Sequence, residues 1–131
     1  MDINNCIPKD KFDTAAIERA NQIGFPSLNS ILSDLLEWVQ DANWPVAAET
    51  AVLLSNAGLE ILPHIKTILR SDDGTWKYWA IDLVVRNLDA DVLLELCDDL
   101  VRLTEDPTQY DQTEDVAALA QSILITKEIQ S

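Results

Sequence analysis

The chain contains very few of the residues on which most catalytic and metal sites depend. One histidine and two cysteines occur among 131 residues, and the cysteines, Cys6 and Cys97, are far apart. Zinc sites and disulfide frameworks usually show closely spaced pairs, so we expect two reduced thiols in a cytoplasmic protein. No metal or cofactor is predicted.

Glycine is also scarce, with three residues in all. Phosphate-binding loops, dinucleotide-binding turns and the nucleophile turn of many hydrolases need glycines at fixed spacings, and none of these patterns is present. His64 accompanies no serine or cysteine in a catalytic motif, so we interpret it as a surface or interface residue rather than part of a triad. The sequence therefore predicts no catalytic residue and no enzyme.

Basic residues are outnumbered, nine Lys and Arg against 23 Asp and Glu, and the net charge is −14. Phosphate backbones and anionic membranes repel such a chain, whereas a basic protein is attracted to it. The alternative is that the acids only keep the protein soluble. The N-terminus shows no secretory signal, and no apolar run reaches membrane-spanning length, which again predicts a cytoplasmic location.

Strand alternation and hairpin signals are absent, and apolar residues follow helical spacing instead, which predicts an all-α fold. One unit occurs twice, because a shift of 32 residues aligns 41–48 with 73–80. The shift pairs Trp44 with Trp76 and, further on, Val52 with Val84. Such a period is typical of stacked helical hairpins, so we predict a short α-solenoid of about seven helices.

Glycine and proline mark the expected helix ends, at Gly24, Pro26, Pro45 and Gly58. The helix expected at about 75–88 is apolar almost all round and should be buried on several sides. A polar loop is expected at 104–112. The prediction is one domain, 1–131, with an extended lead-in at 1–11, hairpins at 12–40, 41–71 and 72–103, and a capping helix at 112–129.

Several segments resemble the bacterial domain-of-unknown-function family 5071 (DUF5071). They are residues 7–13, 36–47, 63–66 and 71–79, of which the words Asn-Trp-Pro-Val-Ala and Trp-Lys-Tyr-Trp are the most specific. That family is similar to HEAT-like helical repeats, so the resemblance implies a HEAT-like solenoid. It implies no activity and transfers no catalytic residue.

The tryptophans that open the two repeated units, Trp44 and Trp76, have two interpretations. Exposed tryptophan is a common anchor for a protein partner. A tryptophan that wedges between neighbouring repeats serves packing instead, and we favour this second interpretation.

The acidic residues also have two interpretations. The repeat places Asp41, Asp73 and Glu105 at equal intervals, each in a turn between units, so they should line one edge. Asp98 and Asp99 are expected to face solvent. An acidic edge could receive a Lys- or Arg-rich surface, but acids also favour the start of the next helix, where the dipole welcomes negative charge. No calcium-loop pattern accompanies them.

The function predicted from these observations is a non-enzymatic, acidic protein-binding module. By analogy of fold and charge, the most specific version of this prediction is an immunity-type inhibitor that blocks the basic active site of a toxin. The alternative is a small-ligand protein or enzyme with a pocket lined by Trp38, Tyr78, Trp79 and His64. The candidate partner-binding residues are Asp41, Trp44, Asp72, Asp73, Lys77, Tyr78, Asp98, Asp99 and Glu105.

Overall fold

The computed structural model describes residues 3–113 and 115–127. Within these ranges the chain is helical and contains no strand, which confirms the all-α prediction. The α-helices are α1 (Thr14–Ile23), α2 (Leu32–Leu36), α3 (Ala47–Leu54), α4 (Leu62–Leu69), α5 (Gly74–Trp79), α6 (Ala90–Leu94), α7 (Cys97–Glu105), α8 (Gln109–Thr113) and α9 (Val116–Thr126). Shorter helical turns join them: 3-10 helices at Ile3–Cys6, Ser27–Ile31, Glu37–Val39, Gly58–Ile61 and Val85–Asn87, and a π-helix at Ala80–Val84.

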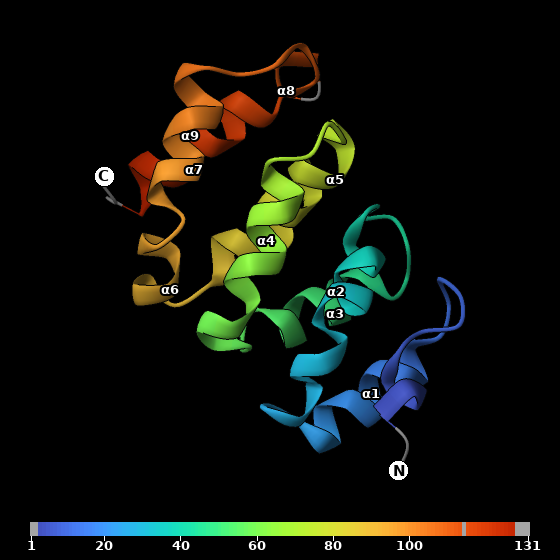
Figure 1. Cartoon of the computed structure of the whole chain (residues 1–131). Coiled ribbons are helices and arrows are strands. Elements are labelled where there is room, and N and C mark those ends of the chain that lie inside the picture. Colours follow the sequence, from blue (N-terminus) through green and yellow to red (C-terminus); the bar gives the residue numbers. More distant parts are fainter. Residues whose placement is uncertain (1–2, 114, 128–131) are drawn as a thin grey trace.

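The helices follow one another in space in nearly the order of the sequence (Figure 1). Helices α1 and α2 both contact α3, α2 contacts α4, and α9 packs on both α5 and α7. The turns at 40–46, 71–73 and 105–108 succeed one another along the upper and right-hand margin of Figure 1, and the intervening turns lie at the lower left. This serial order is compatible with stacked hairpins, and the HEAT-like solenoid stays a prediction.

Local chemistry explains where several helices begin and end. Asp13 accepts a hydrogen bond from the backbone N–H of Ala16 at the start of α1, and Asp73 does the same for Trp76 in α5. A side-chain acceptor of this kind satisfies one of the unpaired N–H groups in the first turn. Gly24, with φ of +72°, ends α1 in a conformation that side chains disfavour.

The segment 74–87 crosses the interior, as its apolar sequence predicts. Ile81 and Val84 are fully buried, and the π-helix that contains them contacts both α3 and α9. The expected single helix is instead divided into α-, π- and 3-10-helical parts. The segment is therefore buried on two sides as predicted, but it does not keep a regular α-helical hydrogen-bonding pattern.

Two expectations about the elements are wrong, and one repeat pair differs in its burial. The lead-in is not extended throughout, because Ile3–Cys6 forms a 3-10 helix. The region expected as a polar loop, 104–112, contains the end of α7 and all of α8 except its last residue. Val52 is 66% exposed whereas its repeat partner Val84 is fully buried, because α9 packs on the π-helix that carries Val84. The capping helix is observed as α9, and residues 114 and 128–131 lie outside the described residues.

Candidate functional site

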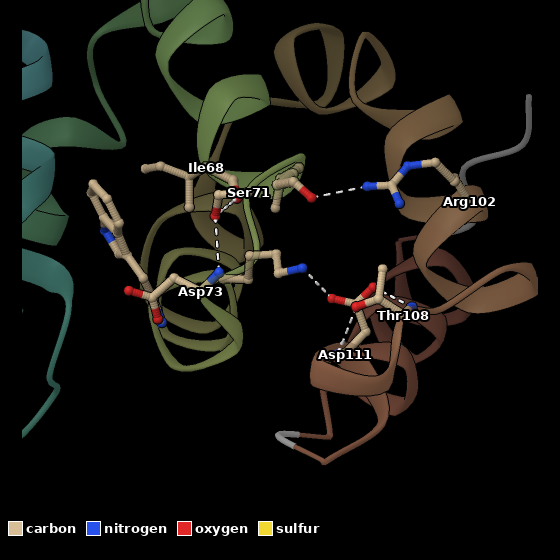
Figure 2. A network of polar contacts seen from close by, with 9 residues as sticks. Ile68, Ser71, Asp73, Arg102, Thr108 and Asp111 are labelled. Carbon is tan, nitrogen blue, oxygen red and sulfur yellow. Dashed lines mark hydrogen bonds and ion pairs between the residues drawn. The ribbon is translucent and has the colours of Figure 1, made fainter.

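Lys77 does not reach a partner surface, because it forms an internal ion pair with Asp111. The Lys77 side chain is 1% exposed and the Asp111 side chain is fully buried. Lys77 Nζ donates to Asp111 Oδ1, which joins α5 to α8 (Figure 2). The expectation that Lys77 is a partner contact is therefore wrong. The fully buried Ala80 and Ile81 follow Lys77 at helical spacing, so Lys77 belongs to the buried side of this segment.

Asp111 also takes part in the capping of α8. The backbone N–H of Thr108 donates to Asp111 Oδ2 over 2.8 Å, and the backbone N–H of Asp111 donates to Thr108 Oγ1 over 3.2 Å (Figure 2). This reciprocal pattern is a capping box, and its Thr-x-x-Asp spacing is a sequence signal that the loop prediction missed. Both carboxylate oxygens of Asp111 are thus satisfied inside the protein.

The surroundings of Asp111 stabilise its charged form. Burial alone would raise the pKa of the Asp111 carboxyl. Hydrogen bonds from Lys77 and Thr108, together with the positive charge of Lys77, outweigh burial and hold this pKa below its usual value. The pair is a structural connection between α5 and α8, and it leaves neither charge available for chemistry.

A second set of polar contacts joins α4 to α7. Arg70 Nε lies 3.0 Å from Asp99 Oδ1. Arg102 Nη2 donates to the carbonyl oxygen of Leu69 over 2.9 Å (Figure 2). The Arg102 guanidinium thereby satisfies a carbonyl at the end of α4, where helical carbonyls have no intrahelical partner. Asp99 is only 6% exposed, so the expectation that it faces solvent is wrong.

The two repeated tryptophans both contact residues of the segment 36–38, but through different groups. The Trp76 indole N–H donates to the carbonyl oxygen of Leu36 over 3.1 Å. The Trp44 ring lies 5.7 Å from the ring of Trp38, at an interplanar angle of 59°. Both side chains are half-buried against the core. Packing within the chain therefore accounts for their positions without a partner.

Tyr78 is engaged in a similar way. Its ring meets the ring of Trp79 edge-on, with centroids 4.8 Å apart, and it is half-buried. An edge-to-face pair of this kind is stabilising by itself. Tyr78 therefore has a structural role that does not depend on ligand or partner.

The carboxylates of the turns divide into two groups. Asp41 accepts a hydrogen bond from the backbone N–H of Asn43 over 2.8 Å, and Asp73 caps α5. Within the described residues, the side chains of Asp72, Glu105 and Asp106 are exposed and make no hydrogen bond or ion pair. We call Asp41, Asp72, Asp73, Glu105 and Asp106 the acidic edge, since their turns follow one margin of the molecule (Figure 1).

Capping does not explain the last two members of the acidic edge. Glu105 is the final residue of α7 and Asp106 is its C-cap. The carboxyl end of a helix carries partial negative charge, so acids there are unfavourable. Asp98 is exposed but belongs to the first turn of α7, about 10 Å from Glu105 along the helix axis. Asp98 and Asp99 are therefore not part of the acidic edge.

A small groove lies between α2, α4 and α5. It encloses about 100 Å³ and is lined by Ser33, Leu36, His64, Thr67, Ile68 and Trp76. Of the four residues expected to line a ligand pocket, His64 alone is among these. Pockets for metabolites usually measure about 300–1,000 Å³, so this groove is too small for such a ligand.

Chemistry outside these features is limited in the part of the chain that the structure describes. No group of three or more histidine, cysteine or acidic side chains is placed to hold a metal ion there. Burial, and then the charge of Asp98, raises the pKa of the Cys97 thiol, which disfavours the nucleophilic thiolate. None of the described helices combines the length and the apolar character needed to cross a membrane.

Comparison with known proteins identifies one family. The model of a family described as "Domain of unknown function (DUF5071)" matches residues 6–124. The match includes every residue of the acidic edge and of the groove. No curated protein matches the chain.

Proposed function

The chain belongs to the DUF5071 family, whose description states no activity, and we propose that it is a non-enzymatic module that binds a basic protein through its acidic edge. Carboxylates that cap a helix or pair with an internal cation are satisfied within the chain. Those of Asp72, Glu105 and Asp106 have no such partner among the described residues and are open to solvent. Lysine or arginine side chains of another protein are their complementary ligands.

The observation that carries this proposal is the placement of Glu105 and Asp106. Both acids lie at the end of α7 where negative charge destabilises the helix, typically by about 0.3–1 kcal/mol for each charge. A solubilising role does not require this position, because an acidic residue anywhere else on the surface would increase the solubility of the protein equally well. A cationic partner that covers the end of α7 offsets the unfavourable interaction and gains affinity from it.

A sharper form of the proposal is an immunity-type inhibitor that acts in the cytoplasm. The active site of a toxin that cleaves nucleic acid is basic, because it must hold phosphates. An acidic module with net charge −14 is attracted to such a site and competes with the phosphates for it. Steric cover by the helices around the edge then completes the inhibition.

Affinity capture from native cells tests the proposal. We expect the wild-type chain to retain a basic protein, identified by mass spectrometry, and the double variant Asp72→Lys/Glu105→Lys to lose it. The matched control is Asp98→Lys, which reverses an exposed, unpaired acid away from the acidic edge. Equal capture by the wild type and the double variant, or equal loss in the control, contradicts binding through this edge.

A further inference from the structure

The groove between α2, α4 and α5 has a fixed apolar floor. Leu36 and Ile68 are 1% and 4% exposed, and the half-buried Trp76 completes the floor. The hydrogen bond from the Trp76 indole N–H to the Leu36 carbonyl oxygen holds the ring in place. Ser33, His64 and Thr67 form a polar rim. We call this feature the Trp76 groove.

The size of the Trp76 groove selects its occupant. A dry protein cavity of about 150 Å³ accepts a benzene molecule. The Trp76 groove, at about 100 Å³, is smaller, and it suits a single aliphatic side chain. An aliphatic side chain seated in a pocket is one form of the buried anchor at the centre of a protein interface.

Acidic residues adjoin the groove on the side of the α4–α5 turn. Ser71 Oγ donates to the carbonyl oxygen of Ile68 over 2.7 Å, and Asp73 Oδ1 lies 3.0 Å from the backbone nitrogen of Trp76. These bonds hold the turn that carries Asp72 and Asp73 against two residues of the groove (Figure 2). The groove and part of the acidic edge therefore form one continuous surface.

The α2 side of the groove is acidic as well. Glu37 is exposed and follows Ser33 by four residues, a spacing that places two side chains on the same side of a helix. Lys66 and Arg70, the cations in α4 and at its C-cap, are four residues apart and lie on a side of α4 that faces away from the groove. Arg70 is paired there with Asp99 of α7. Cationic side chains beside the occupant thus meet carboxylates on two sides.

We propose that the Trp76 groove receives one aliphatic side chain of the basic partner, flanked in the partner chain by lysine or arginine residues. The anchor displaces water from Leu36, Ile68 and Trp76, while its basic neighbours pair with Glu37 and Asp72. This inference rests on the proposed function and adds to it the contact that provides specificity. Charge alone attracts any basic chain, whereas the groove selects those with an aliphatic residue in register.

Two fluorescent peptides test the inference with the full chain. Both carry two arginines on each side of a central residue, which is leucine in one peptide and serine in the other. Fluorescence anisotropy should give a dissociation constant for the leucine peptide that is at least about tenfold lower than that for the serine peptide. This is the advantage expected from burying the leucine side chain. In nuclear magnetic resonance spectra, the Trp76 indole N–H signal should shift with the leucine peptide and much less with the serine peptide.

A groove-filling variant gives the matched comparison. Thr67→Phe places a ring over the groove from an exposed rim position and should abolish the preference for leucine without changing serine-peptide binding. Thr126→Phe adds the same ring at an exposed position of α9 and should preserve the preference. Circular dichroism checks that both variants fold. If Thr67→Phe does not fold, the shift of the Trp76 indole signal in the wild-type chain decides whether the leucine side chain occupies the groove.

The outcomes separate this inference from the proposed function. Equal affinity for both peptides, with an unmoved indole signal, overturns the role of the groove. If that binding is still weakened by salt and by Asp72→Lys, the acidic edge keeps its proposed role. Failure of both peptides to bind at low salt overturns both proposals.

Discussion

Among single residues, Lys77 and Asp111 make the contact most sensitive to mutation. Two opposite charges lie in the interior, and each is held by the other and by the capping box of α8. Desolvation makes a buried pair only weakly stabilising compared with apolar side chains of the same size. Removal of one partner alone is strongly destabilising, because the remaining charge is then buried without an opposite charge beside it.

This asymmetry predicts the behaviour of a mutant series. Asp111→Asn keeps a side chain that can cap Thr108 but leaves Lys77 uncompensated, so we expect a loss of about 3–5 kcal/mol in the free energy of unfolding. Lys77→Met combined with Asp111→Asn should recover most of that loss. Urea unfolding monitored by tryptophan fluorescence measures both. A double variant no more stable than Asp111→Asn contradicts the assignment of the cost to the buried lysine.

The same carboxylate predicts a dependence on pH. The folded-state pKa of Asp111 is lowered, whereas the unfolded chain takes up this proton near the usual value of about 3.9. Its contribution to stability is therefore complete above that value and is lost as pH falls toward the folded-state pKa. Unfolding measured between about pH 5 and pH 2 should show a steeper loss for the wild type than for Asp111→Asn. If the free energy of unfolding falls with pH equally in the wild type and in Asp111→Asn, the Asp111 carboxylate makes no such contribution.

At the scale of elements, α7 carries acids at both ends with opposite consequences. Asp98 and Asp99 lie in its first turn, where the dipole favours them, and Glu105 and Asp106 lie at its end, where it does not. Arg102, in the last turn, is directed to the carbonyl of Leu69 in α4 instead of to these acids. The helix therefore ends in two uncompensated negative charges.

Charge reversal at the two ends of α7 should change stability in opposite directions. Glu105→Lys is expected to raise the free energy of unfolding by about 0.3–1 kcal/mol, and Asp98→Lys to lower it by a similar amount. Thermal unfolding at low ionic strength measures both, and salt should reduce both effects. A decrease in stability for Glu105→Lys means that an internal contact holds this carboxylate, which removes the observation behind the proposed binding edge.

For the whole molecule, the net charge of −14 is the dominant long-range property. Repulsion among so many acids destabilises the compact chain, and it also directs basic molecules toward the surface. Both effects weaken with salt, because the screening length shortens from about 30 Å at 0.01 M to about 8 Å at 0.15 M.

Salt should therefore change folding and binding in opposite ways. We expect the melting temperature of the isolated chain to rise between about 0.01 M and 0.15 M sodium chloride, as internal repulsion is screened. The association rate with a basic partner should fall over the same range. Differential scanning calorimetry and stopped-flow fluorescence measure the two quantities. A melting temperature that falls with salt indicates that attractive ion pairs, and not repulsion, dominate the surface.

The sequence allowed much of the architecture to be predicted, because helical periodicity and capping are local properties. Asp73 caps α5 as its place before a helix indicates, and the apolar segment 74–87 is buried on two sides. The prediction of partner contacts was less successful. The sequence pattern places Lys77 and Asp99 at the surface, whereas both are buried.

By itself, the sequence determined that the chain is helical, where several of its helices begin and end, and that its surface is strongly acidic. Only the tertiary structure decided which charges remain available to a partner. Lys77 meets Asp111 across 34 positions of the chain, and Arg70 meets Asp99 across 29. Periodicity extends over a few helical turns and carries no information about such distant pairs. Burial of a charge depends on the helix that packs over it, and that packing exists only in the folded molecule.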